Sequence, residues 1–176
     1  MTEPRIVSLA ASPAVLDALA ETLIETVAHG GSVSFMHPVS AEVARQFWVG
    51  SLAAAERGER IVFGAFVDES LAGTVTLVLD MPPNQPHRAE IAKMMTRVAH
   101  RNRGIASALL NAAEAGAIAR GKSMLMLDTA TDGGAAKLYE RHGFRCAGEL
   151  PDFALKPHGG LTGTLLYWKQ IAPHRV

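Results

Sequence analysis

The feature that most constrains this chain is a short basic turn near its centre, residues 101–106. A strand-like segment, residues 90–98, precedes the turn, and a strongly helix-forming run, residues 107–120, follows it. The first amides of a helix have no partner within the helix, and together with the helix dipole they bind anionic oxygens, most commonly those of phosphate. A Gly and an Ala in the turn let the backbone approach a ligand closely, and its two arginines add positive charge. The turn therefore predicts a phosphate site between a strand and a helix.

Composition limits the classes of protein to which the chain can belong. Its 176 residues, of which 48% are hydrophobic and 19% charged, suggest one globular domain spanning residues 1–176. A formal net charge of zero argues against a general nucleic-acid binder. The single cysteine, Cys146, excludes an internal disulfide, and the N-terminus lacks the pattern of a signal peptide. No apolar run approaches the ~20 residues of a membrane span. We therefore expect a cytoplasmic protein without a nucleic-acid or membrane partner.

Hydrophobic spacing and turn residues predict the order of the elements. The expected strands are residues 5–10, 61–67, 71–80, 90–98, 123–128, 145–150 and 162–170. Ser12 and Ser40 are expected to cap the first two helices, which precede the second strand. The inner face of the second helix is expected to carry Val43, Phe47, Leu52 and Ala55.

The later part of the chain continues the alternation. Two further helices are expected, over residues 107–120 and 135–142, and residues 151–160 should form a loop because they hold two Pro and two Gly. The predicted order is β-α-α-β-β-β-α-β-α-β-β. It indicates a mixed sheet with helices packed on it.

This order, together with two sequence blocks, resembles the GCN5-related N-acetyltransferase (GNAT) superfamily. The superfamily signature is Arg or Gln, two residues, Gly, one residue, then Gly or Ala, and residues 101–106 match it. Residues 135–144 match the family's Ala-x-x-Leu-Tyr-x-x-x-Gly-Phe block. The resemblance implies an α/β (α+β) fold with a mixed, mostly antiparallel sheet of six to seven strands, a central parallel splayed pair and helices on both faces. It also implies acetyl-CoA as co-substrate and direct transfer of the acetyl group to an amine.

Within the superfamily, the chain most resembles tabtoxin-resistance acetyltransferases. Residues 25–36, 84–91, 127–129 and 148–151 carry this closer resemblance. It implies a small polar amine as acceptor, such as an amino acid or an antimetabolite, and by analogy a role in antibiotic resistance. Dimers are common in the superfamily, so a homodimer stays open.

The resemblance assigns the cofactor site to the central strand and the turn. Backbone groups of the strand would pair with the pantetheine amides, and backbone amides of residues 103–107 would bind the pyrophosphate. Arg101 and Arg103 would reach the pyrophosphate or the 3′-phosphate. The expected cofactor-binding residues are Met94, Met95, Thr96, Arg101, Asn102, Arg103, Gly104, Ile105, Ala106 and Ser107. The family often has Asn where this chain has Asp132, which puts one usual pantetheine contact in doubt.

Two carboxylates and one tyrosine are the expected catalytic residues. An alkyl ammonium has a pKa near ~10, so it must lose a proton before it attacks a thioester. Glu90, which heads the central strand, and Asp128, which ends the next strand, are candidates to accept that proton, directly or through water. Other interpretations are an ion pair of Glu90 with Arg88 or Lys93, and a loop cap by Asp128. Tyr139 matches the family tyrosine that faces the CoA sulfur, and it would donate a proton or a hydrogen bond to the leaving thiolate.

The acceptor pocket is expected where the first two helices join. Ser34, Phe35 and Met36 are the substrate-binding candidates, and His29, His37, Phe153 and His158 are weaker ones. The seven His lack metal-ligand spacing, so no metal is expected. Three alternatives remain: an acetyl-CoA-binding regulator that transfers nothing, another nucleotide-binding α/β domain, and an O- or histone-type acetyltransferase.

Overall fold

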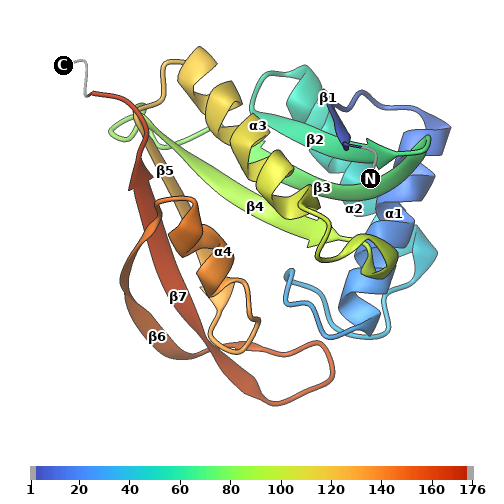
Figure 1. Ribbon diagram of the computed structural model, residues 1–176. Coiled ribbons are helices and arrows are strands. Elements are labelled where there is room, and N and C mark those ends of the chain that lie inside the picture. Colours follow the sequence, from blue (N-terminus) through green and yellow to red (C-terminus); the bar gives the residue numbers. More distant parts are fainter. Residues whose placement is uncertain (1–2, 174–176) are drawn as a thin grey trace.

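A seven-stranded sheet runs through the described part of the chain, residues 3–173, in the computed structural model (Figure 1). Its strands are β1 (Arg5–Ser8), β2 (Arg60–Val67), β3 (Ser70–Val78), β4 (Arg88–Thr96), β5 (Met124–Ala130), β6 (Arg145–Leu155) and β7 (Leu161–Gln170). Their spatial order is β1-β2-β3-β4-β5-β7-β6. All neighbouring pairs are antiparallel except β4 and β5, which are parallel. The predicted mixed sheet with a central parallel pair is confirmed.

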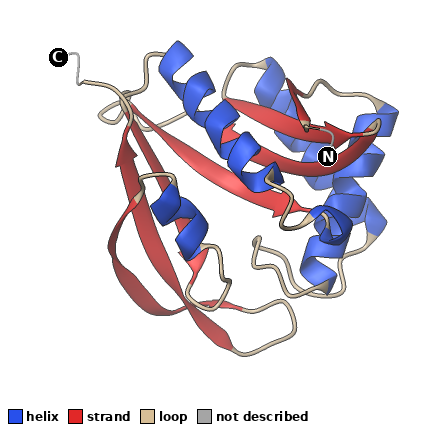
Figure 2. Ribbon diagram, in the orientation of Figure 1, coloured by secondary structure: helices blue, strands red, loops and turns tan. Residues whose placement is uncertain are grey.

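Helices cover both faces of this sheet, as Figure 2 shows. They are α1 (Pro13–Ala28), α2 (Ala41–Glu56), α3 (Ile105–Ala119), α4 (Ala136–Arg141) and a short 3₁₀ helix, η1 (Val98–His100). α1 and α2 pack on one face around the fully buried Trp48. α3 and α4 pack on the other face, where Leu109 and Tyr139 join the core. The predicted order of elements is confirmed throughout.

The first two helices begin where their capping serines predict. The Ser12 hydroxyl accepts a hydrogen bond from the Val15 amide, and the Ser40 hydroxyl accepts one from the Val43 amide, each at 3.2 Å. A capping side chain satisfies an amide that the helix itself leaves free. The expected inner face of α2 is wrong at Val43, which is 52% exposed. The helix instead turns Ala44 and Trp48 inward, because the large indole fills the space above the sheet.

The last two strands are longer than expected. Residues 151–155 belong to β6 rather than to a loop, and the turn to β7 is closed by a hydrogen bond from the Lys156 amide to the Gly160 carbonyl at 2.8 Å. Pro151 fits because β6 is the edge strand and its register shifts between Leu150 and Ala154. A bulge on an edge strand tolerates a residue that cannot donate a hydrogen bond.

Candidate active site

The two parallel strands separate partway along their length. β4 and β5 are in register only at three residue pairs: Arg88 with Met124, Ala89 with Leu125, and Glu90 with Met126. Beyond Glu90 the chain of β4 continues to Thr96, beside β3, and β5 continues to Ala130, beside β7. Figure 1 shows the two ribbons diverging there. The facing edges of both strands therefore carry backbone groups that the partner strand does not use.

A bulge in β4 sets which backbone groups face the splay, the space between β4 and β5 where the two strands separate. The register against β3 shifts between Thr74 and Thr76, and Lys93 adopts a left-handed backbone conformation with φ 52°. After the bulge, the Arg97 amide donates to the Ala72 carbonyl of β3 at 2.9 Å. Backbone amides alternate in direction along a strand, so the Met95 amide also points toward β3. The amide of Thr96 therefore points toward β5.

The side chains of the same segment are part of the two cores. Met95 is 2% exposed and packs under α1 and α2, whereas Met94 packs against the core under α3. Any contact of these methionines with a cofactor would therefore come from their backbone, as the sequence suggested.

The predicted phosphate turn leads directly into α3. The helix begins at Ile105, two residues earlier than expected, and its N-cap is Gly104, with φ 77° and no side-chain cap. Ala108 is the first α3 residue whose amide is bonded, to the Gly104 carbonyl at 3.0 Å. Within residues 3–173, no amide of residues 103–107 donates a hydrogen bond. Such a run of free amides at a helix N-terminus suits a diphosphate.

The side chains of the turn are mostly in solvent. Arg101, Asn102 and Arg103 are exposed, and a guanidinium nitrogen of Arg103 lies 3.2 Å from His100 Nδ1. Ser107 turns the other way, since its hydroxyl lies 3.0 Å from His142 Nε2 beside α4. Both arginines are exposed and have no carboxylate partner among the described residues, while the Ser107 side chain ties α3 to the end of α4.

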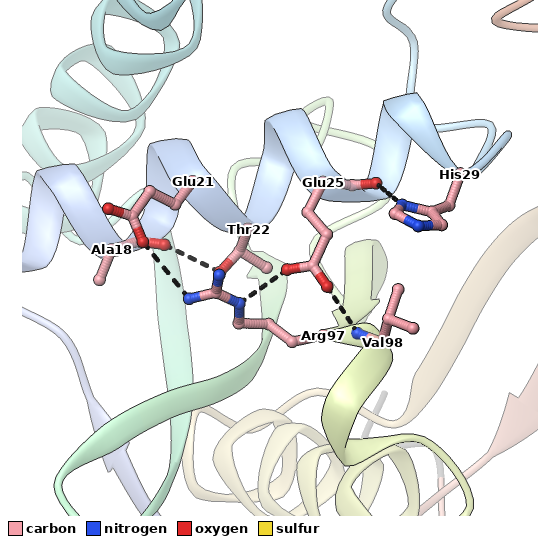
Figure 3. A network of polar contacts seen from close by, with 7 residues as sticks. All are labelled: Ala18, Glu21, Thr22, Glu25, His29, Arg97 and Val98. Atoms are coloured by element: carbon pink, nitrogen blue, oxygen red, sulfur yellow. Dashed lines mark hydrogen bonds and ion pairs between the residues drawn. The ribbon is translucent and has the colours of Figure 1, made fainter.

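An ion-pair network holds the segment before the turn against α1 (Figure 3). Glu25 accepts a hydrogen bond from Arg97 Nε at 2.7 Å and another from the Val98 amide at 2.8 Å. Arg97 also reaches Glu21 at 3.4 Å. Burial alone would raise the pKa of Glu25, but the bonds from Val98 and Arg97 and the charge of Arg97 outweigh it, so the pKa is lowered. Glu25 is therefore a charged anchor for the start of η1.

The two predicted carboxylates lie on one face of the sheet. Glu90 is level with Met126, and Asp128 follows Met126 by two residues, so all three side chains point to the same side. Asp128 accepts a hydrogen bond from the Thr164 hydroxyl at 3.1 Å. Glu90 pairs with Arg88 at 3.3 Å, which is one of the interpretations that the sequence left open. Its carboxylate is nevertheless 43% exposed, so it keeps access to solvent.

Tyr139 reaches the same region from the other side of the sheet. It is 5% exposed and packs against Phe144 and Tyr167. Burial first, and then the negative charge of Asp128, raise its pKa to about 12. The phenol is therefore protonated at neutral pH, and its hydroxyl makes no hydrogen bond with the described residues.

The expected acceptor residues lie in the loop between α1 and α2. Ser34 accepts a hydrogen bond from Lys93 Nζ at 3.2 Å, Phe35 packs edge-on against Phe47 of α2, and Met36 is 46% exposed. This loop contacts the β6–β7 turn, since the His37 amide donates to the Pro157 carbonyl at 2.9 Å. His158 also lies 2.9 Å from the Ala28 carbonyl. These contacts join the segment between α1 and α2 to the β6–β7 turn.

Sequence reasoning missed the contacts of two residues in this region: it gave Glu25 no role and considered Lys93 only as a partner of Glu90. Glu25 anchors Arg97 and Val98, and Lys93 reaches Ser34 from the β4 bulge. Neither position carries a local sequence signal, because each contact joins segments far apart in the chain. The contacts form only when α1 and the loop that follows it pack against β4 in the folded protein.

Among the described residues, no group of three His, Cys, Asp or Glu side chains is placed to hold a metal ion. In the same part of the chain, the helices lack the combined length and apolar character needed to cross a membrane.

Comparison with known proteins agrees with this geometry. Residues 20–144 match the acetyltransferase (GNAT) family. The Salmonella typhimurium protein yncA, solved with its cofactor acetyl-CoA, superposes with a TM-score of 0.81 at 16% identity, covering 99% of this chain and 98% of that one.

Two further solved structures differ in the acceptor that their names give. Ribosomal-protein-alanine N-acetyltransferase from Brucella melitensis has a TM-score of 0.78 at 21% identity, covering 94% of this chain and 99% of its own. Aminoglycoside 6′-acetyltransferase type Ii has a TM-score of 0.72 at 20% identity, with 97% and 99% covered. At these identities the likeness concerns the fold alone.

Proposed function

The chain belongs to the acetyltransferase (GNAT) family, and we propose that it transfers an acetyl group from acetyl-CoA directly to a small-molecule amine. The observation that carries the proposal is that the free amides of residues 103–107 follow directly along the chain from the unpaired edge of β4. A diphosphate on those amides would place the pantetheine arm along the edge of β4, like an added strand. The thioester would then lie in the splay, on the side where Glu90 and Asp128 stand.

The acceptor amine has to lose a proton before it attacks. Asp128 is the stronger candidate to attract the ammonium, because its charge is felt at both Lys93 and Tyr139 and its ordinary partner is a neutral hydroxyl. Glu90 shares this face and is partly exposed, so it can pass the proton to solvent through water. Either carboxylate is a weak base, so a water relay and electrostatic attraction carry the step together.

The attack creates an oxyanion and then a thiolate. The Thr96 amide points into the space between β4 and β5, whereas the Met95 amide points toward β3, so we assign stabilisation of the oxyanion to the Thr96 amide. Tyr139, with a pKa raised to about 12, holds its proton more strongly than a thiol of pKa ~8.5 does. It would therefore stabilise the leaving thiolate by a hydrogen bond rather than by full proton transfer.

The remaining assignments are also proposals. The tabtoxin-resistance resemblance supports an amino-acid-like antimetabolite as acceptor, with Ser34, Phe35 and Met36 lining its pocket and detoxification as the role. We propose a cytoplasmic location and action without a metal.

A homodimer is supported by edge strand β6, whose Leu150, Phe153 and Leu155 are 44%, 56% and 55% exposed. Light scattering behind size-exclusion chromatography would detect it.

The test combines binding with turnover. The double variant Arg101→Ala/Arg103→Ala should weaken acetyl-CoA binding about tenfold while the melting temperature without ligand stays close to wild type. The control is Arg120→Ala, because this exposed arginine lies at the opposite end of α3. Unchanged binding by the double variant would refute the phosphate assignment.

Turnover separates the transferase from its main rival. We expect CoA release when acetyl-CoA is offered with amino acids, polyamines or aminoglycosides. Tight acetyl-CoA binding with no release from any of these amines would favour the silent regulator instead.

A further inference from the structure

We propose that Lys93 binds a carboxylate of the acceptor, so that the natural acceptor is a small amino-carboxylic acid rather than a purely cationic amine. The inference rests on the proposed function, because it takes the face that carries Glu90 and Asp128 as the acceptor side. It assigns a specificity role to a residue that the transfer chemistry itself does not use.

The backbone of β4 directs Lys93 toward this side. The residue forms the bulge, with φ 52°, and a left-handed conformation is costly for any residue other than glycine. Its side chain leans over the Phe47 ring of α2, with Nζ 5.7 Å from the ring centroid. Nζ then donates to the Ser34 hydroxyl at 3.2 Å. The ammonium is thus held between α2 and the loop that holds the expected acceptor residues.

Some of the basic side chains on this face of the sheet have a carboxylate partner, and others do not. Arg88 pairs with Glu90, and Arg97 pairs with Glu25. Within residues 3–173, neither Lys93 nor Arg60 has a carboxylate within 4.0 Å.

Arg60 adds a second cation to the same row of the sheet, and one of its nitrogens lacks a hydrogen-bond partner among the described residues. It is level with Val78, which is level with Glu90, so the three side chains share a face. The guanidinium donates to the Ser51 hydroxyl through Nη1 at 3.4 Å, whereas its buried Nε has no hydrogen-bond partner among the described residues. Lys93 and Arg60 are therefore two cations on this face of the sheet without a carboxylate within 4.0 Å among the described residues.

The local electrostatics favour an incoming anion. Burial is the main cause that lowers the pKa of Lys93, the charge of Arg60 lowers it further, and Asp128 opposes both. A half-buried ammonium without a counter-ion in contact is costly, and a carboxylate bound to it would relieve that cost. Asp128 lies within electrostatic reach of Lys93, so an acceptor with its ammonium near Asp128 and its carboxylate near Lys93 finds both charges matched.

The experiment compares each acceptor with its own neutral analogue. L-amino acids and their primary amides are offered at saturating acetyl-CoA, and rates are expressed per fraction of free amine. We expect the wild-type enzyme to prefer the acids. Lys93→Met should raise KM for the acids about tenfold, with kcat and the KM for acetyl-CoA nearly unchanged, and should leave the amides unaffected. Lys93→Arg should retain most of the preference.

A second variant separates charge from loop anchoring. Ser34→Ala removes the contact of Lys93 with the loop but keeps the ammonium, so it should change the preference for acids by less than Lys93→Met does. Equal loss for acids and amides in Lys93→Met would overturn the inference, since that result means a structural role. A fall in kcat at constant KM would also overturn it, because Lys93 would then be a proton acceptor.

Failure of this inference is distinguishable from failure of the proposed function. Turnover of amides or polyamines alone, independent of Lys93, would leave a transferase and overturn the carboxylate assignment. If nothing is turned over, calorimetry with the CoA-bound protein and the same acids decides. Binding of the acids that depends on Lys93 would support the inference and contradict the transferase proposal. Absence of such binding would contradict both.

Discussion

Glu25 of α1 accepts a hydrogen bond from the backbone amide of Val98 at 2.8 Å, although the two residues are 73 positions apart. Val98 opens η1, the short helix that leads into the turn of residues 101–106. The carboxylate also pairs with Arg97 Nε at 2.7 Å. One side chain therefore fixes both the residue that follows β4 and the first residue of η1. The position of the free α3 amides therefore depends on α1.

Removing the charge of Glu25 should affect both stability and cofactor binding. Glu25→Gln keeps the size of the side chain but weakens two charge-assisted hydrogen bonds, so we expect a loss of about 1–2 kcal/mol in unfolding free energy. Acetyl-CoA binding should weaken as well, because the turn loses its anchor. Glu21→Gln is the matched control, since Glu21 is 65% exposed and reaches the same arginine only at 3.4 Å. Equal effects of the two variants would contradict the anchoring role.

The same carboxylate predicts a pH dependence. Its folded-state pKa lies below the ordinary value of 4.5, so the folded protein binds fewer protons than the unfolded chain in that range. The stabilisation from Glu25 is therefore complete above pH 4.5 and is lost as pH falls through the folded-state pKa. Urea titrations should show wild type more stable than Glu25→Gln at pH 6, with the difference shrinking below pH 4.5. A constant difference across this range would disagree with the lowered pKa.

Variants at two glycines, one at each end of α3, distinguish an effect of backbone strain from an effect on acetyl-CoA binding. Gly104 has φ 77° and Gly121 has φ 72°, and a Cβ at either position would meet no atom within 4 Å. Gly104→Ala and Gly121→Ala should therefore each cost about 1 kcal/mol in stability, through backbone strain alone. Only Gly104→Ala should also weaken acetyl-CoA binding, as measured by calorimetry. Comparable binding by both variants would place the phosphate elsewhere.

Most of the fold could be predicted from local chemistry. The serine caps of α1 and α2, the glycine that starts α3 and the apolar runs of the strands all act within a few residues, and the sequence shows them directly. The end of β6 was missed because Pro151 and two glycines are typical of a loop, whereas pairing with β7 keeps this stretch extended. Val43 was misplaced because the rotation of α2 is set by the burial of Trp48, a tertiary effect.

The site was predictable only where it is built from backbone. The free amides of residues 103–107 follow from a glycine turn before a helix, and the structure has them. The contacts of Glu25 with Val98, Lys93 with Ser34 and Arg88 with Glu90 depend on side-chain positions in the folded protein. Of these, only the pairing of Arg88 with Glu90 was open to sequence reasoning, because residues two apart on a strand share a face. Spacing carries no information about the other two contacts, which join distant segments of the chain.

The hydroxyl of Tyr139 should matter for catalysis and little for stability. Tyr139→Phe should lower kcat about 10- to 100-fold and leave acetyl-CoA affinity and melting temperature nearly unchanged. Because the pKa of Tyr139 is raised to about 12, the midpoint of the pH–rate profile should not move in the variant. The neighbouring Tyr167 is the control, since its hydroxyl donates to Glu140 at 3.0 Å. Tyr167→Phe should lose stability and keep kcat, and the reverse pattern would contradict the assignment.

The most direct test of the central claim is a crystal structure of the protein with acetyl-CoA. The account predicts pyrophosphate oxygens about 2.7–3.2 Å from backbone amides of residues 103–107, and pantetheine amides paired with the free edge of β4. Acetyl-CoA bound elsewhere, or amides of residues 103–107 bonded to the protein instead of the pyrophosphate, would contradict it.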